Sequence, residues 1–250
     1  MPAYDFTAPR LYVAADLAEG ARLPLERAPA NYLLNVLRRG PDDPVLVFNG
    51  RDGEWRADLV QTGRKGADLR VAVQTRPQPA PADLHYLFAP IKSARLDYLA
   101  QKAVEMGAGT IRPVITRFTQ GDRVNVERLR ANAIEAAEQC GILAIPDCPE
   151  PGRLPEVLAG LEPARLLVFC DEDAPVRDPV RALVTAADPE APPPLAVLVG
   201  PEGGFSDEER ALIRARPNTV ALSLGPRILR ADTAAVAVLT LVQAVLGDAR

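Results

Sequence analysis

The stretch "LVGPEGGFSDEE" (residues 198–209) ends an apolar run that is typical of a strand buried on both faces of a sheet. After its glycine-rich turn, Ser206 and Glu209 have the spacing of a capping box, which predicts the start of a helix. Asp207 and Glu208 add negative charge where the helix dipole is positive. Strand, turn and helix in this order form the repeating unit of a parallel α/β sheet.

The turn itself, "GPEGG" (residues 200–204), indicates what such a loop could hold. Its glycines let the backbone approach a ligand closely or turn with a positive φ. A phosphate site would use the N–H groups of the helix start together with a Lys or Arg, whereas carboxylates crowd this start. A neutral or cationic ligand without phosphate, such as S-adenosylmethionine, fits better. The pentapeptide alone leaves a simple tight turn as the alternative.

A second loop of the same kind is "LSLGPRILRADTAA" (residues 222–235), which again leads from an apolar strand through glycine to a helix. If the two strands are adjacent and parallel, both loops lie at the same carboxyl edge, where α/β sheets bind ligands. Arg227 and Arg230 flank two apolar residues, so we expect both guanidiniums near this edge. A solvated arginine pair is the structural alternative.

The rest of the chain divides into two parts with different patterns. Up to Val73, short strands and turn signals with one helical stretch (28–39) predict a small β-barrel-like domain. "TRPQPAPAD" (75–83) has three prolines and no hydrophobic period, which is typical of a domain boundary. Beyond it, apolar strands alternate with amphipathic helices, which predicts a parallel α/β sheet covered by helices on both faces. The predicted domains are therefore 1–74 and 84–250, joined by the linker 75–83.

Composition limits the class of protein. The chain has 250 residues, 48% hydrophobic and 25% charged, as in soluble globular proteins. Its longest apolar stretch, 234–246, is shorter than the roughly 20 residues of a membrane span, so no membrane contact is expected. The N-terminus lacks a secretory pattern and the three cysteines lack CxxC spacing, which favours the cytoplasm. A single histidine excludes sites that need two imidazoles, and we expect no metal.

Taken together, the motifs have a specific likeness. "LVGPEGGFSDEE" and "LSLGPRILRADTA", with "RLDYLAQKAVEMGAGTIRPVIT" and "AIEAAEQCG" before them, resemble the RsmE family of 16S ribosomal RNA uracil-N3 methyltransferases, a branch of the SPOUT superfamily. "PRLYV" and "NVLR" extend the likeness into the first domain. The resemblance implies an N-terminal PUA-like β-barrel that binds RNA and a C-terminal SPOUT domain with a deep trefoil knot. It also implies a homodimer that methylates one uridine of the small ribosomal subunit.

The resemblance also implies site residues. By position, the pocket for the methyl donor S-adenosylmethionine would comprise Leu198, Gly200, Glu202, Gly203, Leu222, Leu224, Gly225, Ile228, Leu229 and Thr233. The sequence departs from the family in two places. Ala231-Asp232-Thr233 stands where the family often has Thr-Glu-Thr, and Asn31 or Tyr32 stands where it often has a histidine.

Chemistry assigns roles to a few charged residues. Uracil N3 is a weak acid, so the enzyme must stabilise the negative charge that spreads onto O2 and O4, and we assign this role to Arg230. Asp232 or Glu138 could accept the proton, although a helix cap or an intrahelical partner is the alternative for each. The candidates for contact with RNA phosphates are Arg10, Arg38, Arg39 and Arg117.

Two other classes compete with this interpretation. A non-catalytic RNA-binding protein with a decayed methyltransferase fold would bind RNA but no methyl donor. A dinucleotide enzyme of the Rossmann type would need GxGxxG early in a βαβ unit, and the sequence has no such pattern.

Overall fold

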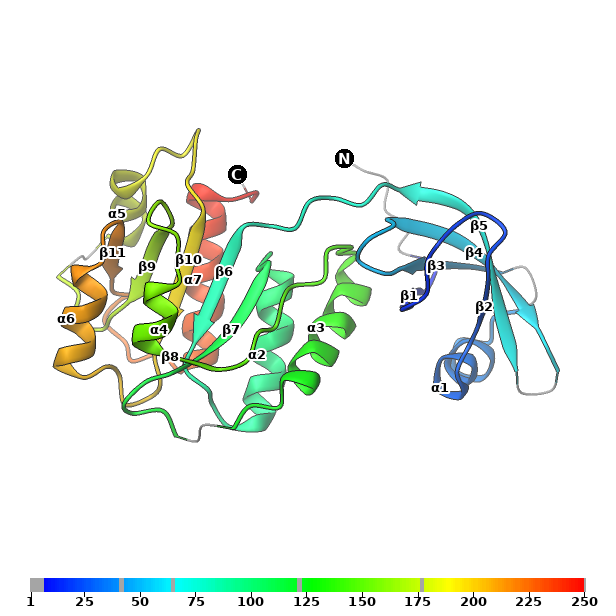
Figure 1. The fold of residues 1–250 in the computed structure, drawn as a ribbon, viewed down its shortest axis with the longest axis horizontal. Coiled ribbons are helices and arrows are strands. Elements are labelled where there is room, and N and C mark those ends of the chain that lie inside the picture. The colour runs from blue at the N-terminus through cyan, green and yellow to red at the C-terminus, as the bar shows by residue number, and fades with distance from the viewer. Residues whose placement is uncertain (1–6, 41–42, 64–65, 121–122, 176–177, 250) are drawn as a thin grey trace. The chain divides into compact units, whose positions relative to one another are not determined.

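The computed structural model describes residues 7–40, 43–63, 66–120, 123–175 and 178–249. The chain forms two compact units (Figure 1). The first unit contains residues 1–80 and 137–145, and the second contains residues 81–136 and 146–250. The segment 137–145 therefore belongs with the N-terminal part of the chain, although it is far from it in sequence. The limits 1–74, 75–83 and 84–250 remain a prediction.

A mixed five-stranded sheet forms the first unit. Its strand order is β1 (Arg10–Tyr12), β3 (Pro44–Phe48), β4 (Glu54–Gln61), β5 (Ala67–Arg76) and β2 (Arg22–Pro24). β1 pairs with β3 in parallel, and the other pairs are antiparallel. The predicted single helix is split into α1 (Arg27–Asn31) and the π-helix η1 (Tyr32–Val36). Alternate apolar residues of the strands pack with Ala30 and Leu33 in one core.

The second unit is built on a six-stranded sheet, and every pair of neighbouring strands is parallel, as predicted. The order is β11 (Thr219–Leu222), β9 (Leu166–Cys170), β10 (Leu195–Val199), β6 (Leu84–Phe88), β7 (Thr110–Ile115) and β8 (Gly152–Arg153). All five residues of β10 are buried, because this strand lies between β9 and β6 and both of its faces are covered. The expected continuous apolar run thus reflects a central position in the sheet.

Helices cover both faces of this sheet (Figure 1). On the near face, α4 (Leu154–Ala159) and α6 (Asp207–Ala215) pack on side chains such as Leu167 and Leu198. On the far face, α7 (Ala231–Leu246) packs against β10, and α2 (Ser93–Glu105) and α5 (Pro179–Ala186) pack against α7. α3 (Val126–Cys140) is joined to α2 by the ion pair between Arg128 and Asp97.

The structure corrects one expectation about strand order. The strands that precede the two glycine-rich loops, β10 and β11, are not adjacent, because β9 lies between them and pairs with both. A helical connection can place a strand beside any other strand of a sheet, so the sequence pattern does not determine this order. Both loops still leave the carboxyl edge, and the loop after β9 joins them there. The trefoil knot implied by the resemblance remains a prediction.

Candidate functional site

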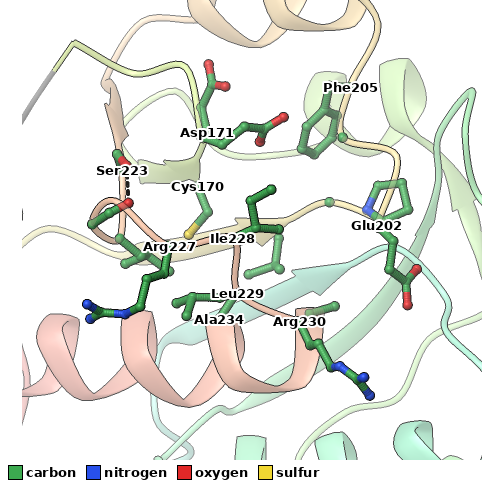
Figure 2. A pocket seen from close by; sticks show the side chains of 18 of the residues that line it. Cys170, Asp171, Glu202, Phe205, Ser223, Arg227, Ile228, Leu229, Arg230 and Ala234 are labelled. Carbon is green, nitrogen blue, oxygen red and sulfur yellow. Dashed lines mark hydrogen bonds between the residues drawn. The ribbon is translucent and has the colours of Figure 1, made fainter.

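A cavity of about 450 Å³ lies at the carboxyl edge of β9, β10 and β11 (Figure 2). The loop after each of these strands supplies part of its wall, and the first turn of α7 supplies the rest. The lining residues are Cys170, Asp171, Glu172, Val199, Gly200, Pro201, Glu202, Gly204, Phe205, Leu222, Ser223, Leu224, Gly225, Arg227, Ile228, Leu229, Arg230, Ala231 and Ala234. Its volume falls in the range of roughly 300–1,000 Å³ that is usual for small-molecule sites.

The loop after β10 is shaped by close packing around its glycines. A Cβ at Gly200 would lie 2.4 Å from the Phe205 ring, so no other residue fits there without displacing the ring. Gly204 has φ +67°, a conformation that favours glycine. The predicted capping box is confirmed: Ser206 Oγ accepts the Glu209 N–H (3.3 Å), and Glu209 Oε2 accepts the Ser206 N–H (3.0 Å). The N–H groups of Ser206 and Glu209 at this helix start are therefore bonded within the protein.

The loop after β9 adds an acidic wall that the sequence analysis missed. Asp171 is fully buried and accepts hydrogen bonds from Arg210 Nη1 and Arg214 Nη2, both at 2.5 Å. Glu172 pairs with Arg210 at 2.7 Å. Burial raises the pKa of the neighbouring Cys170 thiol to about 12, so this thiol is protonated and not nucleophilic at neutral pH. The signal was present in the sequence, because acidic residues directly follow the buried strand "LLVFC".

Arginines and aliphatic side chains of the loop after β11 form the remaining wall. Arg230 precedes α7 with extended backbone and is exposed. Neither Arg227 nor Arg230 forms an ion pair within the described part of the chain. In Figure 2 the side chains of Arg230 and Glu202 extend toward the same side of the cavity. Gly225 has φ +105° and open space around it, so this turn brings bare backbone to the cavity.

The chain matches two family models and is similar to proteins of known family. A family model described as an RNA methyltransferase domain matches residues 78–243, and one described as an RNA methyltransferase PUA domain matches residues 25–72. Ribosomal RNA small subunit methyltransferase E of Rickettsia conorii is 31% identical over 228 residues, which is 91% of each chain. The chain belongs to the methyltransferase E family.

A second relative and two solved structures are also similar to the chain. Methyltransferase E of Synechocystis is 31% identical over 95% of this chain and 78% of its own length. A Legionella pneumophila structure solved in complex with the cofactor SAM is 29% identical, with a TM-score of 0.80 over 95% of this chain and 97% of that one. Methyltransferase E of Neisseria gonorrhoeae, bound to S-adenosyl methionine, shares the fold with a TM-score of 0.83 at 24% identity over 96% and 99%.

Within this family member, most residues assigned by resemblance to the methyl-donor pocket line the cavity. Those that do are Gly200, Glu202, Leu222, Leu224, Gly225, Ile228 and Leu229. Three do not: Leu198 of β10 is fully buried in the core, Gly203 faces Phe118, and Thr233 is exposed on α7. The assignment by resemblance did not include the loop after β9 or the lining residues Val199, Pro201, Gly204, Phe205, Ser223, Ala231 and Ala234. Arg227 and Arg230, which the sequence places near this edge, also line the cavity.

The candidate proton acceptors differ in their surroundings. Asp232 lies in the first turn of α7 next to the cavity residue Ala231, and its carboxylate accepts the Thr233 N–H at 2.9 Å. Glu138 belongs to the first unit, where its carboxylate accepts the Tyr12 N–H at 2.7 Å. The structure therefore gives Glu138 a structural role as an acceptor for β1, which differs from the helix cap or intrahelical partner expected as its alternative.

The four arginines proposed to contact RNA also differ in their exposure and in their partners. Arg10 is not available to a phosphate, because its side chain is 5% exposed and pairs with the buried Glu54 at 2.7 Å. This corrects the expectation for Arg10. Arg38 is exposed, and Arg39 Nη2 donates to the carbonyl of Thr7 at 2.8 Å. Arg117 is exposed in the second unit, where Glu209 Oε1 accepts its backbone N–H at 2.8 Å.

A second, smaller cavity of about 290 Å³ lies at the same carboxyl edge, beside the loops after β6 and β7. Three of its lining residues are cations and one is an acid: Lys92, Arg123, Arg128 and Asp97. Arg128 is bound to Asp97, whereas Lys92 and Arg123 form no ion pair with a described residue. The loops of this edge thus form a largely apolar cavity with acidic groups and, next to it, a basic one.

Proposed function

We propose that this protein transfers a methyl group from S-adenosylmethionine to N3 of a specific uridine in 16S ribosomal RNA. The observation that carries the proposal is the 450 Å³ cavity at the carboxyl edge, with acidic groups in its wall and Arg230 at its rim. Family membership supports RNA methyl transfer. The uracil-N3 specificity follows the resemblance of the two glycine-rich loops to the uracil-N3 methyltransferases.

The residues present fit this donor. S-adenosylmethionine has a flat purine, a sulfonium cation and no phosphate. Leu222, Leu224 and Leu229 offer apolar contacts for the purine. The backbone at Gly225 has open space around it, so its peptide groups could form hydrogen bonds with the polar edge of the purine. The capped start of α6 and the nearby carboxylates disfavour a phosphate but suit a cation. The carboxylates of Asp171, Glu172 and Asp173 lie close together, but Arg210 pairs with all three of them, and we propose no metal.

Two charged residues of the chain, Arg230 and Asp232, would support the transfer. When bound, the donor supplies an electrophilic methyl group on sulfur. N3 of uracil loses its proton and forms a bond to the methyl carbon as the carbon–sulfur bond breaks. The negative charge on O2 and O4 during this step would be stabilised by the Arg230 guanidinium, which forms no ion pair with a described residue. We propose that Asp232, two residues after Arg230, accepts the proton.

The partners follow from the same proposal. The PUA-like first unit would bind the RNA, with Arg38 and Arg39 as phosphate contacts, and Arg117 would contribute from the second unit. The outer side of α7, with Val236, Ala237 and Leu241 only partly covered, favours a homodimer. No described helix is long and apolar enough to span a membrane. The proposed place of action is the cytoplasm, on the small ribosomal subunit.

Calorimetry with S-adenosylmethionine, NAD and 16S ribosomal RNA, each titrated separately, tests the donor assignment. We expect the purified protein to bind S-adenosylmethionine and not NAD. Binding of RNA without binding of S-adenosylmethionine would favour the non-catalytic alternative, and binding of NAD alone would favour a dinucleotide enzyme. Either result would contradict the proposed function.

A further inference from the structure

An exposed aromatic ring lies beside the loop after β10. Phe118 follows β7 at the carboxyl edge of the sheet and is 44% exposed. A Cβ built on Gly203 would lie 3.1 Å from Phe118 Cβ and 3.6 Å from its Cγ, so Phe118 packs directly over this glycine. Gly203 is flanked by the cavity residues Glu202 and Gly204. The ring therefore lies next to the proposed methyl-donor site, and the glycine at 203 makes room for it.

Hydrogen bonds hold the turn that carries this ring. Thr119 Oγ1 accepts the Thr116 N–H at 2.9 Å, and the two threonine hydroxyls lie 2.9 Å apart. The Thr119 N–H donates to the Thr116 carbonyl at 3.2 Å. Glu209, the capping residue of α6, accepts the Arg117 N–H at 2.8 Å. The backbone on both sides of Phe118 is therefore held in place, which lowers the entropy cost of binding a flat partner on its ring.

The surroundings of Phe118 indicate the chemistry of that partner. Arg117 is exposed next to it, and Gln120 lines the second cavity together with Lys92 and Arg123. Arg95 lies 3.7 Å from the carboxylate of Glu202, the residue before Gly203. An exposed phenyl ring with basic residues in its own loop and in the neighbouring cavity matches a single-stranded nucleic acid, whose bases stack on aromatic rings while basic side chains contact the backbone.

A second exposed aromatic residue of this unit makes a useful comparison. Tyr98 on α2 is 46% exposed, but the Lys102 ammonium lies 5.4 Å from its ring centroid. One face of that ring is therefore covered by a cation–π contact within the protein. No cation–π contact involves Phe118 within the described residues.

We propose that Phe118 is a substrate-binding residue on which an unpaired base of the RNA stacks next to the methyl donor. The inference rests on the proposed function, because it identifies the acceptor side of the same site. Enzymes that modify a base must take it out of its stack, and stacking on an apolar or aromatic side chain offsets part of that cost. The loop after β7 would thus present the base, and the loop after β10 would hold the donor.

The test compares variants in two binding measurements. Unmethylated 16S ribosomal RNA transcribed in vitro is titrated against the parent, Phe118→Ala, Phe118→Trp and Tyr98→Ala, and each protein is separately titrated with S-adenosylmethionine. We expect Phe118→Ala to weaken RNA binding by about 5- to 150-fold, the size of one lost base–aromatic stack. Phe118→Trp should bind like the parent, because it keeps an aromatic face. Tyr98→Ala should bind RNA like the parent.

Two further readouts separate stacking from other roles. Phe118 carries no charge, so its loss should leave the salt dependence of RNA binding unchanged. Unchanged RNA affinity in Phe118→Ala, an equal loss in Tyr98→Ala, or a parallel loss of donor affinity would each overturn the proposal. A parallel loss would mean that the ring only supports the Gly203 turn. A parent protein that binds RNA but transfers no methyl group would contradict the proposed function. The comparison of RNA affinities between the parent and the Phe118 variants would still test the role of Phe118.

Discussion

At the scale of single residues, the rim of the large cavity concentrates the proposed chemistry on Arg230. This side chain lies at the start of α7, lines the cavity and has no ion pair within the described chain. A cation that is not committed to a carboxylate can stabilise charge that develops in the transition state. Arg227 lies three residues earlier in the same wall and offers a matched comparison.

We expect Arg230→Ala to lower the rate of methyl transfer by about 10²- to 10³-fold, the usual effect of removing one charge-stabilising donor. Donor affinity should change little, because the interaction forms with the reacting uracil. Single-turnover rates at saturating donor and RNA measure the effect, and Arg227→Ala should lose less. Full activity of Arg230→Ala would contradict the role assigned here.

At the scale of elements, the start of α6 connects three parts of the second unit. Its capping box joins Ser206 to Glu209, and Glu209 also holds the backbone of Arg117 after β7. Further along the helix, Arg210 and Arg214 bind Asp171 after β9. One helix therefore fixes the loops of three strands at the carboxyl edge.

Removing the cap should weaken this element measurably. Ser206→Ala leaves the Glu209 N–H without its side-chain acceptor, and we expect a loss of about 0.5–2 kcal/mol in the free energy of unfolding. Ser206→Asp should restore most of it, because aspartate is an equally good cap. Chemical denaturation followed by far-UV circular dichroism measures both variants. Equal stability of Ser206→Ala and the parent would show that the capping bond contributes nothing.

Elements were largely predictable from the sequence, whereas the full site was not. The apolar strands of the second unit and helices such as 126–140 follow from periodicity, because each buries a defined face. Two short helices, α4 and α5, were not predicted, since so few residues carry little periodic signal. The loop after β9 was missed because its contribution depends on strand order, which places β9 between β10 and β11.

At the scale of the whole molecule, a buried ion-pair network contributes to the first unit. Glu54 is 4% exposed in its side chain and pairs with Arg10 and with Arg76 at 2.6 Å. Burial alone would raise the pKa of Glu54, but hydrogen bonds from Arg76, Arg10 and Thr75 outweigh it and hold this pKa below its ordinary value of 4.5. The first unit thus depends on a carboxylate that must stay ionised.

The sign of the pH dependence follows from that lowered pKa. The stabilisation is fully present above about pH 4.5, the ordinary pKa, and is lost as the pH falls through the lower folded pKa. Glu54→Gln should abolish this dependence and cost about 3–5 kcal/mol at neutral pH, because it removes the buried carboxylate that two guanidiniums share. The single tryptophan, Trp55, lies in β4 and reports unfolding of this unit by fluorescence.

A surface ion pair provides the control for this prediction. Asp16 is 93% exposed in its side chain and pairs with Arg51, so Asp16→Asn should change stability by less than about 1 kcal/mol. If Glu54→Gln were as mild as Asp16→Asn, or if acid unfolding stayed the same in both, the network would not have the role given to it here.

The most direct test of the whole account is the product of the reaction. The purified protein is incubated with S-adenosylmethionine and small ribosomal subunits that lack the modification, and the RNA is then digested and its nucleosides are analysed by mass spectrometry against methyluridine standards. We predict N3-methyluridine at one position of 16S ribosomal RNA, formed in amounts that depend on the donor. The absence of any methylated uridine, or methylation at another atom, would contradict the central claim.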